Sequence, residues 1–393
     1  MHMYARLANP LELDNFFLFG ARGVGKTTLL STFFKEKKVL RVDLLLAEEE
    51  ERFSGHPDQL KELIAADSAI EWVVIDEIQK IPKLLDIVHS IIETKENKVK
   101  FALTGSSAKK LKRGSANLLA GRALINNLFP LTFLEMGEAF DLEAALSFGL
   151  LPKIVNTENS LHKSEILKSY TQAYLKEEVW AEQMVKNLAP FRKFLEVAAQ
   201  MNTEIINYSK IARTIGVATH TVQGYFQILE DTLLAHILEP FNTSVRKRLI
   251  SAPKFYFFDI GVKRALDRTI NQTVVAGTYE YGRAFEHFII TQLIALNSYY
   301  RSDFRFGYLK TKDGLEIDLI IERPGQSLVL LEIKSSINVD KSDLLGLRSV
   351  VKDFPGAVFL CACQDKLARR MENIYILPWK KAIEKIFNNG ELG

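Results

Sequence analysis

The sequence has few cysteines and no long apolar run, and both absences exclude classes of protein. Only two cysteines, Cys361 and Cys363, occur in 393 residues, too few for a disulfide-stabilised secreted domain. Alternation in AVFLCACQ places both thiols on the same face of an expected strand, so we interpret them as buried and expect a reducing cytoplasm. No apolar run reaches the roughly 18 residues that a membrane-spanning helix needs. The opening residues lack a signal-peptide pattern, and we expect no membrane association.

The chain also lacks a strong charge of either sign. A formal net charge of +3 does not by itself indicate nucleic-acid binding, but cations gather in AKKLKR (108–113) and SVRKRL (244–249). Each run is either a solvated loop or a phosphate-binding surface. The length predicts two or three domains, and without repeats or low-complexity linkers we expect them to pack together.

A strand, a glycine-rich loop and a helix follow one another in NFFLFGARGVGKTTLLSTFF. The loop fits the pattern G-x-x-x-x-G-K-[ST], in which backbone N–H groups and a helix N-terminus bind phosphates. Lys26 would bind the β- and γ-phosphates of ATP, and the Thr27 hydroxyl would bind Mg²⁺. The residues expected to bind the nucleotide here are Gly20, Gly23, Gly25, Lys26, Thr27 and Thr28.

Two acidic residues end the apolar segment EWVVIDEIQK. Asp76 would hold Mg²⁺ through water and Glu77 would orient the attacking water, unless the strand simply ends at a solvated acidic turn. The next strand-like segment, KVKFALTGSSA, ends with Thr104 and Ser106, whose hydroxyls would sense the γ-phosphate. Arg122 precedes a further strand and would either stabilise transition-state charge, in its own or a neighbouring subunit, or be a structural surface side chain.

The segments GARGVGKTT, VVIDEIQK, LTGSSA, LAGRA and PLTFLE together resemble a group of bacterial and archaeal AAA-type ATPases. In that group an amino-terminal ATPase is followed by a conserved domain that often has a restriction-endonuclease-like fold. SFGLLPKIV, YLKEEVW and KFYFFDIGVKRAL also resemble this group, so the resemblance covers essentially the whole chain. These later segments are typical of the family but do not indicate a chemistry.

Residues 191–262 predict a winged helix-turn-helix domain. A short helix in YSKIARTIGV ends at Gly216, a second helix follows in ATHTVQGYFQILEDTLLA, and the strand-like segments AHILEPF and KFYFFD flank the wing. Tyr225 would share the start of the second helix with the residues that face DNA. Such a domain serves either DNA contact or protein packing, and the sequence leaves both open. The residues expected to contact nucleic acid, in the second helix and the wing, are Thr219, Thr221, Gln223, Arg246, Lys247 and Arg248.

Two strand-like segments near the carboxyl end carry charges, Asp318 in EIDLII and the pair Glu332 and Lys334 in LLEIKSS. Residues two apart share one face of a strand, so Glu332 and Lys334 would project together and Asp318 would join them from the neighbouring strand. The helix YEYGRAFEHFIITQLIAL would bring Glu286. The order helix, three strands, helix, strand is that of the restriction-endonuclease core, whose signature is an acid followed by (D/E)-x-K.

Carboxylates in this arrangement suit Mg²⁺ or Mn²⁺, and we expect Glu286, Asp318 and Glu332 to hold the metal. The metal would polarise a phosphodiester and help to make hydroxide from water. Glu332 and Lys334 would act in catalysis, with Lys334 positioning the nucleophile or stabilising transition-state charge. Two alternatives stay open: an ordinary ion pair on an exposed sheet face, and a nuclease fold that no longer cuts.

We therefore expect an α/β protein with four parts: a P-loop AAA ATPase core with a parallel sheet (1–135), a helical lid (136–190), a winged helix-turn-helix (191–262) and a restriction-endonuclease-like domain (263–393). The expected function is ATP-regulated DNA processing, in genome defence or repair, with ATP and Mg²⁺ or Mn²⁺ as cofactors. DNA is the expected partner, and a homo-oligomer is considered. The alternative is an ATP-switched module that binds DNA or protein and whose nuclease-like fold does not cut.

Overall fold

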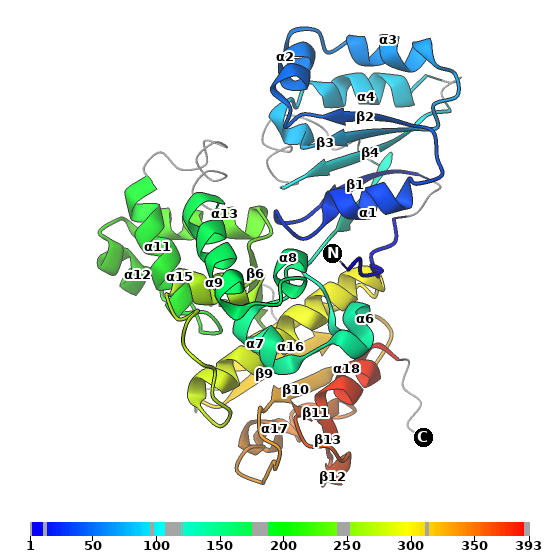
Figure 1. The fold of residues 1–393 in the computed structure, drawn as a ribbon. Helices are drawn as coiled ribbons and strands as arrows, with labels where there is room; N and C mark the ends of the chain where they lie inside the picture. Colours follow the sequence, from blue (N-terminus) through cyan, green and yellow to red (C-terminus); the bar gives the residue numbers. More distant parts are fainter. Residues whose placement is uncertain are drawn as a thin grey trace. The chain divides into compact units, whose positions relative to one another are not determined.

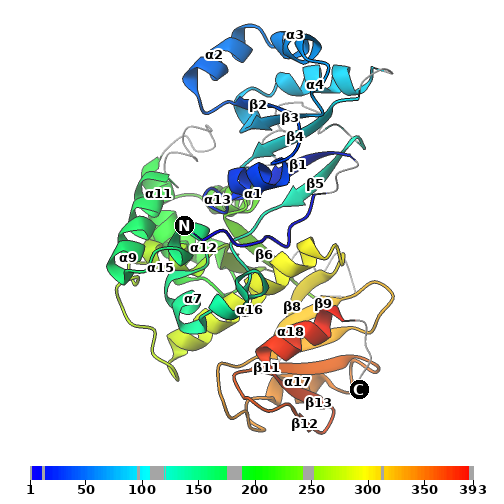
Figure 2. The same cartoon turned by 45° about the vertical axis from the view of Figure 1, so that its right-hand side comes forward.

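The computed structural model describes residues 2–10, 14–94, 98–106, 119, 121–174, 188–241, 252–310 and 314–388. The chain divides into two compact units (Figures 1 and 2). Unit 1 comprises Met1–Leu131, Leu151–Lys153 and Ile228–Leu234. Unit 2 comprises Thr132–Leu150, Ile154–Gln227 and Ala235–Gly393.

Unit 1 is built on a parallel sheet with the strand order β2-β3-β4-β1-β5. Its strands are β1 (Asn15–Phe19), β2 (Val39–Asp43), β3 (Trp72–Asp76), β4 (Lys100–Gly105) and β5 (Ala123–Asn127). Because β1, β3 and β4 are parallel neighbours, their carboxyl ends meet at one edge, where α/β folds bind ligands. The predicted parallel α/β core is thus present.

Helices cover both faces of this sheet (Figures 1 and 2). Phe17 and Phe19 of β1 pack in one core with side chains from α2, α3 and α4. Phe16, one residue out of phase, contacts Phe33 of α1 and Trp72 of β3, as the period of two along a strand requires. The helices of this unit are α1 (Lys26–Phe33), α2 (Ala47–Gly55), α3 (Gln59–Ala66), the 3-10 turn η1 (Ile78–Lys80) and α4 (Leu84–Ile92).

Unit 2 contains most of the helical segments that follow. They are α6 (Phe133–Met136), the 3-10 turn η2 (Gly137–Ala139), α7 (Leu142–Phe148), α8 (Pro152–Val155), α9 (Ser160–Ser169), the π-helix η3 (Tyr170–Tyr174), α11 (Leu188–Gln200), α12 (Tyr208–Ile215), α13 (Thr219–Asp231), α15 (Ile260–Leu266), α16 (Tyr279–Tyr299), α17 (Leu345–Val350) and α18 (Trp379–Phe387). The two predicted helices are α12 and α13, and α12 begins at an Asn207 cap and ends at Gly216, whose φ is 73°.

A mixed sheet in unit 2 has the order β12-β13-β11-β10-β9-β8-β6-β7. Its strands are β6 (Ala235–Pro240), β7 (Lys254–Phe257), β8 (Arg305–Lys310), β9 (Glu316–Glu322), β10 (Val329–Ile333), β11 (Val358–Cys363), β12 (Arg369–Met371) and β13 (Ile374–Pro378). The predicted order of a helix, three strands, a helix and a strand is found in α16, β8, β9, β10, α17 and β11. Cys361 and Cys363 are buried in the core beside α17, as predicted.

The hairpin of β6 and β7 differs from expectation in its neighbours. We expected these strands to belong to the winged-helix region alone, but β6 pairs in parallel with β8 through Glu239–Gly307 and Pro240–Tyr308. Side chains of β7 thus reach the sheet that carries the charged segments. The wing between the strands, residues 242–251, lies outside the described part of the chain.

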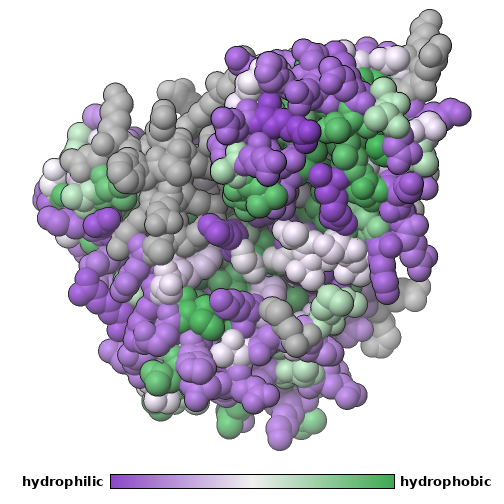
Figure 3. Space-filling view, turned by 45° about the horizontal axis from the view of Figure 1, so that its top comes forward, coloured by the Kyte–Doolittle hydropathy of each residue, from purple (hydrophilic) through white to green (hydrophobic). Residues whose placement is uncertain are grey.

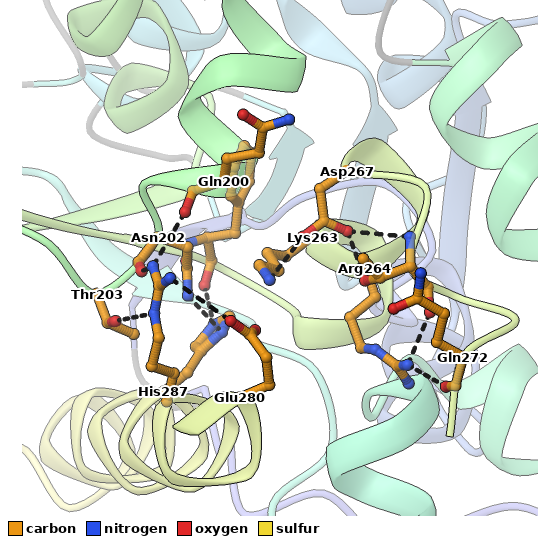
Figure 4. A network of polar contacts seen from close by, with 12 residues as sticks. Gln200, Asn202, Thr203, Lys263, Arg264, Asp267, Gln272, Glu280 and His287 are labelled. Carbon is orange, nitrogen blue, oxygen red and sulfur yellow. Dashed lines mark hydrogen bonds and ion pairs between the residues drawn. The ribbon is translucent and has the colours of Figure 1, made fainter. Parts of the chain in front are cut away.

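The family-typical segment KFYFFDIGVKRAL has a structural role. Asp259 caps α15 through Val262 N and accepts a further hydrogen bond from Leu150 N at 2.7 Å. A Cβ atom on Gly149, whose φ is 74°, would lie 2.2 Å from Asp259 Oδ1, so only glycine fits there. Arg264 donates to the backbone carbonyls of Ser147 and Thr269, and Lys263 pairs with Asp267 at 2.7 Å (Figure 4).

His287 of α16 joins three elements in the same network (Figure 4). Its Nε2 lies 2.5 Å from Phe257 O and its Nδ1 lies 3.1 Å from Asn202 Nδ2. Because a carbonyl only accepts, Nε2 carries the proton and Nδ1 accepts from the amide. Asn202 Oδ1 in turn accepts from Phe257 N at 2.8 Å. The imidazole is therefore neutral in the fold, and burial lowers its pKa to about 3.

On the face shown in Figure 3, hydrophilic residues predominate and hydrophobic residues appear in separate groups. No helix within the described ranges combines the length and apolar character that would let it span a membrane.

The neutral His287 predicts an acid-sensitive unit 2. An unfolded histidine titrates near 6.5, so between that pH and about 3 the unfolded chain binds the extra proton. The stabilisation is complete above pH 6.5 and is lost as pH falls through this window, by about 2 kcal/mol between pH 7 and pH 5 at this residue. Urea unfolding of unit 2 at both pH values measures it. His287→Gln should reduce the difference, whereas His162→Gln, at an exposed histidine of the same unit, should leave it in place; an equal loss in all three proteins contradicts the assignment.

Candidate functional site

The phosphate-binding loop lies between β1 and α1, and its backbone requires glycine. Gly23 and Gly25 have φ values of 81° and 100°, which other residues rarely adopt. A Cβ atom on Gly20 would lie 2.5 Å from Leu128 O. Lys26 is buried, and its Nζ donates to Gly20 O at 2.8 Å. The loop is thus folded around the lysine that the motif assigns to the phosphates.

The residues that the motif predicts to hold Mg²⁺ lie together at the strand ends. Thr27 Oγ1 donates to Asp76 Oδ2 at 3.2 Å, and Thr104 Oγ1 donates to Asp76 Oδ1. Thr104 also accepts from Glu77 N at 3.2 Å. The structure therefore brings together side chains of β3, β4 and α1 that the sequence separates by up to 77 positions, from Thr27 to Thr104. Thr28, the next helix residue, has an exposed side chain.

Glu77 adopts a left-handed conformation with a φ of 57°, rare for a glutamate. Its Oε1 lies 4.0 Å from Lys26 Nζ. Gln79 donates both to Glu77 Oε2 and to Ser106 Oγ, and no donor among the described residues reaches Gln79 Oε1. Sequence reasoning missed this glutamine. The sequence signal that could have indicated a buried polar contact is the position of Gln79 between two isoleucines, Ile78 and Ile81, both of which are buried.

Arg122 has a partner in its own unit, since its Nε binds Glu93 Oε1 at the surface. This placement is the one expected of a structural surface arginine. A role for Arg122 in catalysis therefore stays a prediction, and residues 107–118, which include the basic run at 108–113, lie outside the described chain.

The residues predicted to read DNA have different exposures in α13. Thr219 and Gln223 are exposed and Thr221 is half-buried. Tyr225 is buried and packs against Phe191 and Phe194 of α11, so our expectation that it shares the DNA-facing start of the helix is wrong. Two positions after Gln223, the side chain of Tyr225 lies about 200° further around the helix, on the core side. Arg246, Lys247 and Arg248 lie outside the described residues.

A β-bulge sets the position of Asp318 in unit 2. Strand β9 pairs with β8 at Ile320–Gly307 and again at Ile317–Leu309, which leaves one extra residue of β9 between these pairs. Bulges re-aim side chains and are common beside active sites. Asp318 Oδ2 accepts from Ile333 N at 2.8 Å, just beyond the last β9–β10 pair, Leu319–Leu331. The carboxylate thus accepts the hydrogen bond from a β10 backbone N–H that a carbonyl group of β9 would accept if the strand pairing continued.

Glu332 and Lys334 project from the same side of β10, as the period of two predicted. Lys334 Nζ lies 2.8 Å from Glu332 Oε1. Glu332 is 5% exposed, and no donor in the described part of the chain reaches its second oxygen, Oε2. A surface ion pair does not fit this burial, because the carboxylate is inside the unit.

Glu286 of α16 contacts residues that sequence reasoning missed. Its Oε1 lies 3.2 Å from Lys254 Nζ and accepts from Tyr256 Oη at 2.7 Å. Lys254 Nζ also binds Glu316 Oε1, and the Lys254 side chain is 3% exposed. Lys254 and Tyr256 are two positions apart on β7, so both side chains lie on the side of the strand that faces Glu286. Their strand was assigned to the winged helix, so its side chains were not considered.

The pKa values show that these charges affect one another. Burial raises the pKa of Asp318 well above its usual range, and the charges of Glu332 and Glu286 raise it further. Burial raises the pKa of Glu332 as well. Burial opposes the charge on Lys254, but Glu286 and the other carboxylates outweigh it and raise its pKa. Burial likewise opposes the charge on Lys334, but the nearby carboxylates, Glu332 above all, outweigh it and raise the pKa of Lys334.

Carboxylate oxygens are the ligands that hard divalent cations prefer, so the arrangement of these side chains decides whether they suit a metal. Within the described ranges no group of three or more acidic, histidine or cysteine side chains is arranged to hold a metal ion. Asp318 and Glu332 repel each other, and no donor among the described residues reaches the buried Glu332 Oε2.

A family model described as an AAA domain matches residues 14–137. Two domains of unknown function match the rest, DUF8612 over residues 139–273 and DUF4143 over residues 281–382. An uncharacterized protein of Mycobacterium tuberculosis is 24% identical over 312 residues, which cover 79% of this chain and 68% of that protein. An uncharacterized protein of Methanocaldococcus jannaschii is 22% identical over 364 residues, or 86% of this chain and 78% of the relative.

Among solved structures, AMPPCP-bound DnaA from Aquifex aeolicus is 15% identical, covers 57% of this chain and 84% of its own, and has a TM-score of 0.25. A Thermococcus gammatolerans assembly of McrB AAA+ hexamers with bound McrC is 11% identical, covers 68% and 80%, and has a TM-score of 0.26. These scores are too low to support a functional argument. The domain match and the loop geometry together identify residues 14–137 as an AAA-type nucleotide-binding domain.

Proposed function

We propose that the protein hydrolyses ATP in unit 1 and cleaves phosphodiester bonds of nucleic acid, most simply DNA, in unit 2. The two activities rest on different observations. The first is supported by the convergence of Lys26, Thr27, Asp76 and Glu77. The second is supported by the buried Oε2 of Glu332, which no donor among the described residues reaches, beside Asp318 and Lys334.

The ATPase proposal assigns a role to each group at the strand ends. Lys26 and the loop N–H groups would bind the phosphates, and Thr27 with Asp76 would hold Mg²⁺. Glu77 would orient the attacking water, and its contact with Gln79 fixes the carboxylate. Gln79 also donates to Ser106 at 3.2 Å. The proposed γ-phosphate sensor, Ser106, and the proposed water-orienting residue, Glu77, therefore have Gln79 as a common hydrogen-bond partner.

For this activity we expect Lys26→Ala to lose ATP hydrolysis and most ATP binding, because the buried cation on the phosphates is removed. Glu77→Gln should keep ATP binding and lower kcat by about 100-fold or more, because only the carboxylate that orients water is lost. Steady-state turnover and ATP binding measured on both variants test this. Lys80→Ala, at a lysine paired with Glu50 outside the loop, is the control and should turn over like the wild type. Wild-type turnover by Lys26→Ala or Glu77→Gln would refute the ATPase proposal.

The phosphodiesterase proposal uses the residues at the end of β9 and β10. Asp318 and Glu332 would hold one Mg²⁺ or Mn²⁺, which when bound would polarise the scissile phosphate and acidify water. Lys334, held by Glu332 at 2.8 Å, would place its ammonium beside the charge that develops on the phosphate. The Asp318 hydrogen bond from Ile333 N fixes that carboxylate relative to β10. Burial excludes water around these groups and strengthens their electrostatic effect.

Nucleic-acid binding would come from α13 and the wing. The exposed Thr219 and Gln223 stand at the start of α13, where a winged helix meets bases, while Thr221 and the wing cations Arg246, Lys247 and Arg248 complete the proposed surface. Genome defence or repair, and a homo-oligomer with Arg122 acting in its own or a neighbouring subunit, are parts of the same proposal. If unit 2 binds nucleic acid but never cuts it, the protein is an ATP-switched binding module instead.

Two substitutions separate a cleavage centre from a structural ion pair. Asp318→Ala and Lys334→Ala should each lower cleavage by at least about 100-fold while ATP turnover stays within twofold. Asp318→Ala should also weaken Mn²⁺ binding, whereas Lys334→Ala should retain it because both carboxylates remain. Cleavage of single-stranded DNA, duplex DNA and RNA is measured with Mg²⁺ or Mn²⁺, with and without ATP.

Matched controls are Asp353→Ala and Lys341→Ala, which remove exposed charges of the same unit and should cut normally. Failure of the wild type to cut any of the three nucleic acids with either metal would leave only the binding module.

A further inference from the structure

We propose that the edge of the sheet formed by β12 and β13, together with α18, binds the phosphate backbone of nucleic acid. The cations that would contact phosphates are Arg370 of β12 and Lys381 and Lys385 of α18, and we call this surface the basic edge. The inference rests on the proposed phosphodiesterase function and names a second contact with its substrate, apart from α13 and the wing.

Residues 365–388, which contain the basic edge, carry a net charge equal to that of the whole protein. Six lysines and arginines stand against three acidic residues in this segment, a net charge of +3, and the rest of the 393 residues is formally neutral. A concentration of positive charge on one surface is typical of proteins that bind nucleic acid. Five of the six cations are exposed and Lys385 is half-buried; the six are Lys366, Arg369, Arg370, Lys380, Lys381 and Lys385.

Two of these cations lie over one aromatic ring at the edge of the sheet, where β12 is the last strand (Figure 1). Arg370 and Tyr375 are directly opposite each other on the antiparallel strands β12 and β13, so their side chains share a face of the sheet. The Arg370 guanidinium lies 5.0 Å from the centre of the Tyr375 ring, and Lys385 Nζ lies 4.8 Å from the same centre. The ring attracts both cations and thus gathers two charges that repel each other.

The acidic residues of the segment do not balance the two cations over the ring. Asp365 pairs with Arg369 at 3.2 Å, and Glu372 pairs with Arg348 at 3.1 Å. The third acid, Glu384, forms no ion pair with a described residue. Within the described ranges the two cations over the ring therefore have no carboxylate partner, and an anion from outside the chain would supply one.

Two further cations increase the repulsion at Lys385. The Arg323 side chain is buried and donates to the backbone carbonyls of Ser327 and Ile386. Burial and the charge of Arg323 lower the pKa of Lys385. Lys381 lies one helical turn before Lys385, and like charges at this spacing destabilise a helix slightly. A bound phosphate offsets this repulsion.

The shape and polarity of the basic edge favour a nucleic-acid backbone over a membrane. Lys381 and Lys385 are four positions apart, about 6 Å along the axis of α18, so the cations form a row that suits a chain of phosphates. A membrane surface would instead need exposed apolar side chains on the same helix. The exposed residues of α18 and its C-cap are all polar: Lys380, Lys381, Glu384 and Asn388.

The register of the sheet relates the basic edge to the proposed cleavage residues. Glu332 pairs with Cys361, Cys361 with Ile376, and Ile376 with Arg369, the residue next to Arg370. Three strand spacings, roughly 14 Å, therefore separate Glu332 from the edge strand at the same level of the sheet. About four phosphates of one nucleic-acid strand span this distance, so the basic edge would hold the substrate beside the scissile phosphate.

Binding of the full-length protein to fluorescent single-stranded DNA, measured by anisotropy over a range of salt without metal or nucleotide, tests the inference. Arg370→Gln with Lys385→Gln should flatten the slope of log K against log salt by about 1.4, the value for two phosphate contacts, and weaken binding at about 0.1 M salt by about 20-fold. Arg370→Lys with Lys385→Arg keeps both charges and should keep the slope. Lys341→Gln with Lys352→Gln removes two exposed lysines of the same unit outside the basic edge and, as the matched control, should bind like the wild type.

Lys381→Gln, at an exposed residue, keeps the inference testable if the double variant does not fold, and should flatten the slope by about 0.7. An unchanged slope in the variant that folds would overturn the inference and leave the phosphodiesterase proposal standing. Displacement of DNA from the wild type by poly-glutamate at an equal concentration of charge would do the same, because it indicates an acidic protein partner. Cleavage with Mn²⁺ is measured separately, so a wild type that never cuts, with the expected loss of slope in the variants, would remove only the phosphodiesterase proposal. A wild type that binds no DNA would remove both.

Discussion

The balance of buried charge at the end of one sheet is the constraint on which unit 2 depends. Four carboxylates and two ammonium groups gather where β7, β9, β10 and α16 meet. Each buried charge costs several kcal/mol unless it is paired. Lys254 and Lys334 offset part of this cost, but Glu332 and Glu286 still repel the charge of Asp318, and no donor among the described residues reaches the second oxygen of Glu332. A fold selected only for stability gains nothing from this arrangement, whereas a centre that binds a cation does.

Unit 1 also brings charged and polar side chains together at one edge of a sheet. The carboxyl ends of β1, β3 and β4 meet at one edge, so Lys26, Asp76 and Thr104 are close although the sequence separates them. Strain is placed at the same edge, since Glu77 adopts a left-handed backbone that glutamate rarely takes. Gln79 holds Glu77 and Ser106 together, and it thereby links the two side chains that would respond to the γ-phosphate.

Local patterns in the sequence predicted the parts of the structure whose physics is local. The phosphate loop depends on glycines within six positions, and the pairing of Glu332 with Lys334 depends on a period of two along one strand. Both were predicted from residues that are neighbours in sequence. The short helix α12, which ends at Gly216, was predicted for the same reason.

Long-range features could not be predicted in this way. Lys254 lies 64 positions before Asp318 in the chain, and it reaches the carboxylates only because a hairpin assigned to another domain joins their sheet. A bulge has no clear signature in EIDLII, so the re-aiming of Asp318 was not visible. Tyr225 was misplaced because its helix buries the face that carries it, which depends on packing against α11.

The most direct test of the buried centre is a crystal structure of the wild-type protein grown with Mn²⁺ and measured at the manganese absorption edge. The account predicts an anomalous peak about 2.1 Å from carboxylate oxygens of Asp318 and Glu332, a distance typical of small hard cations. A structure with no manganese at these oxygens would contradict it.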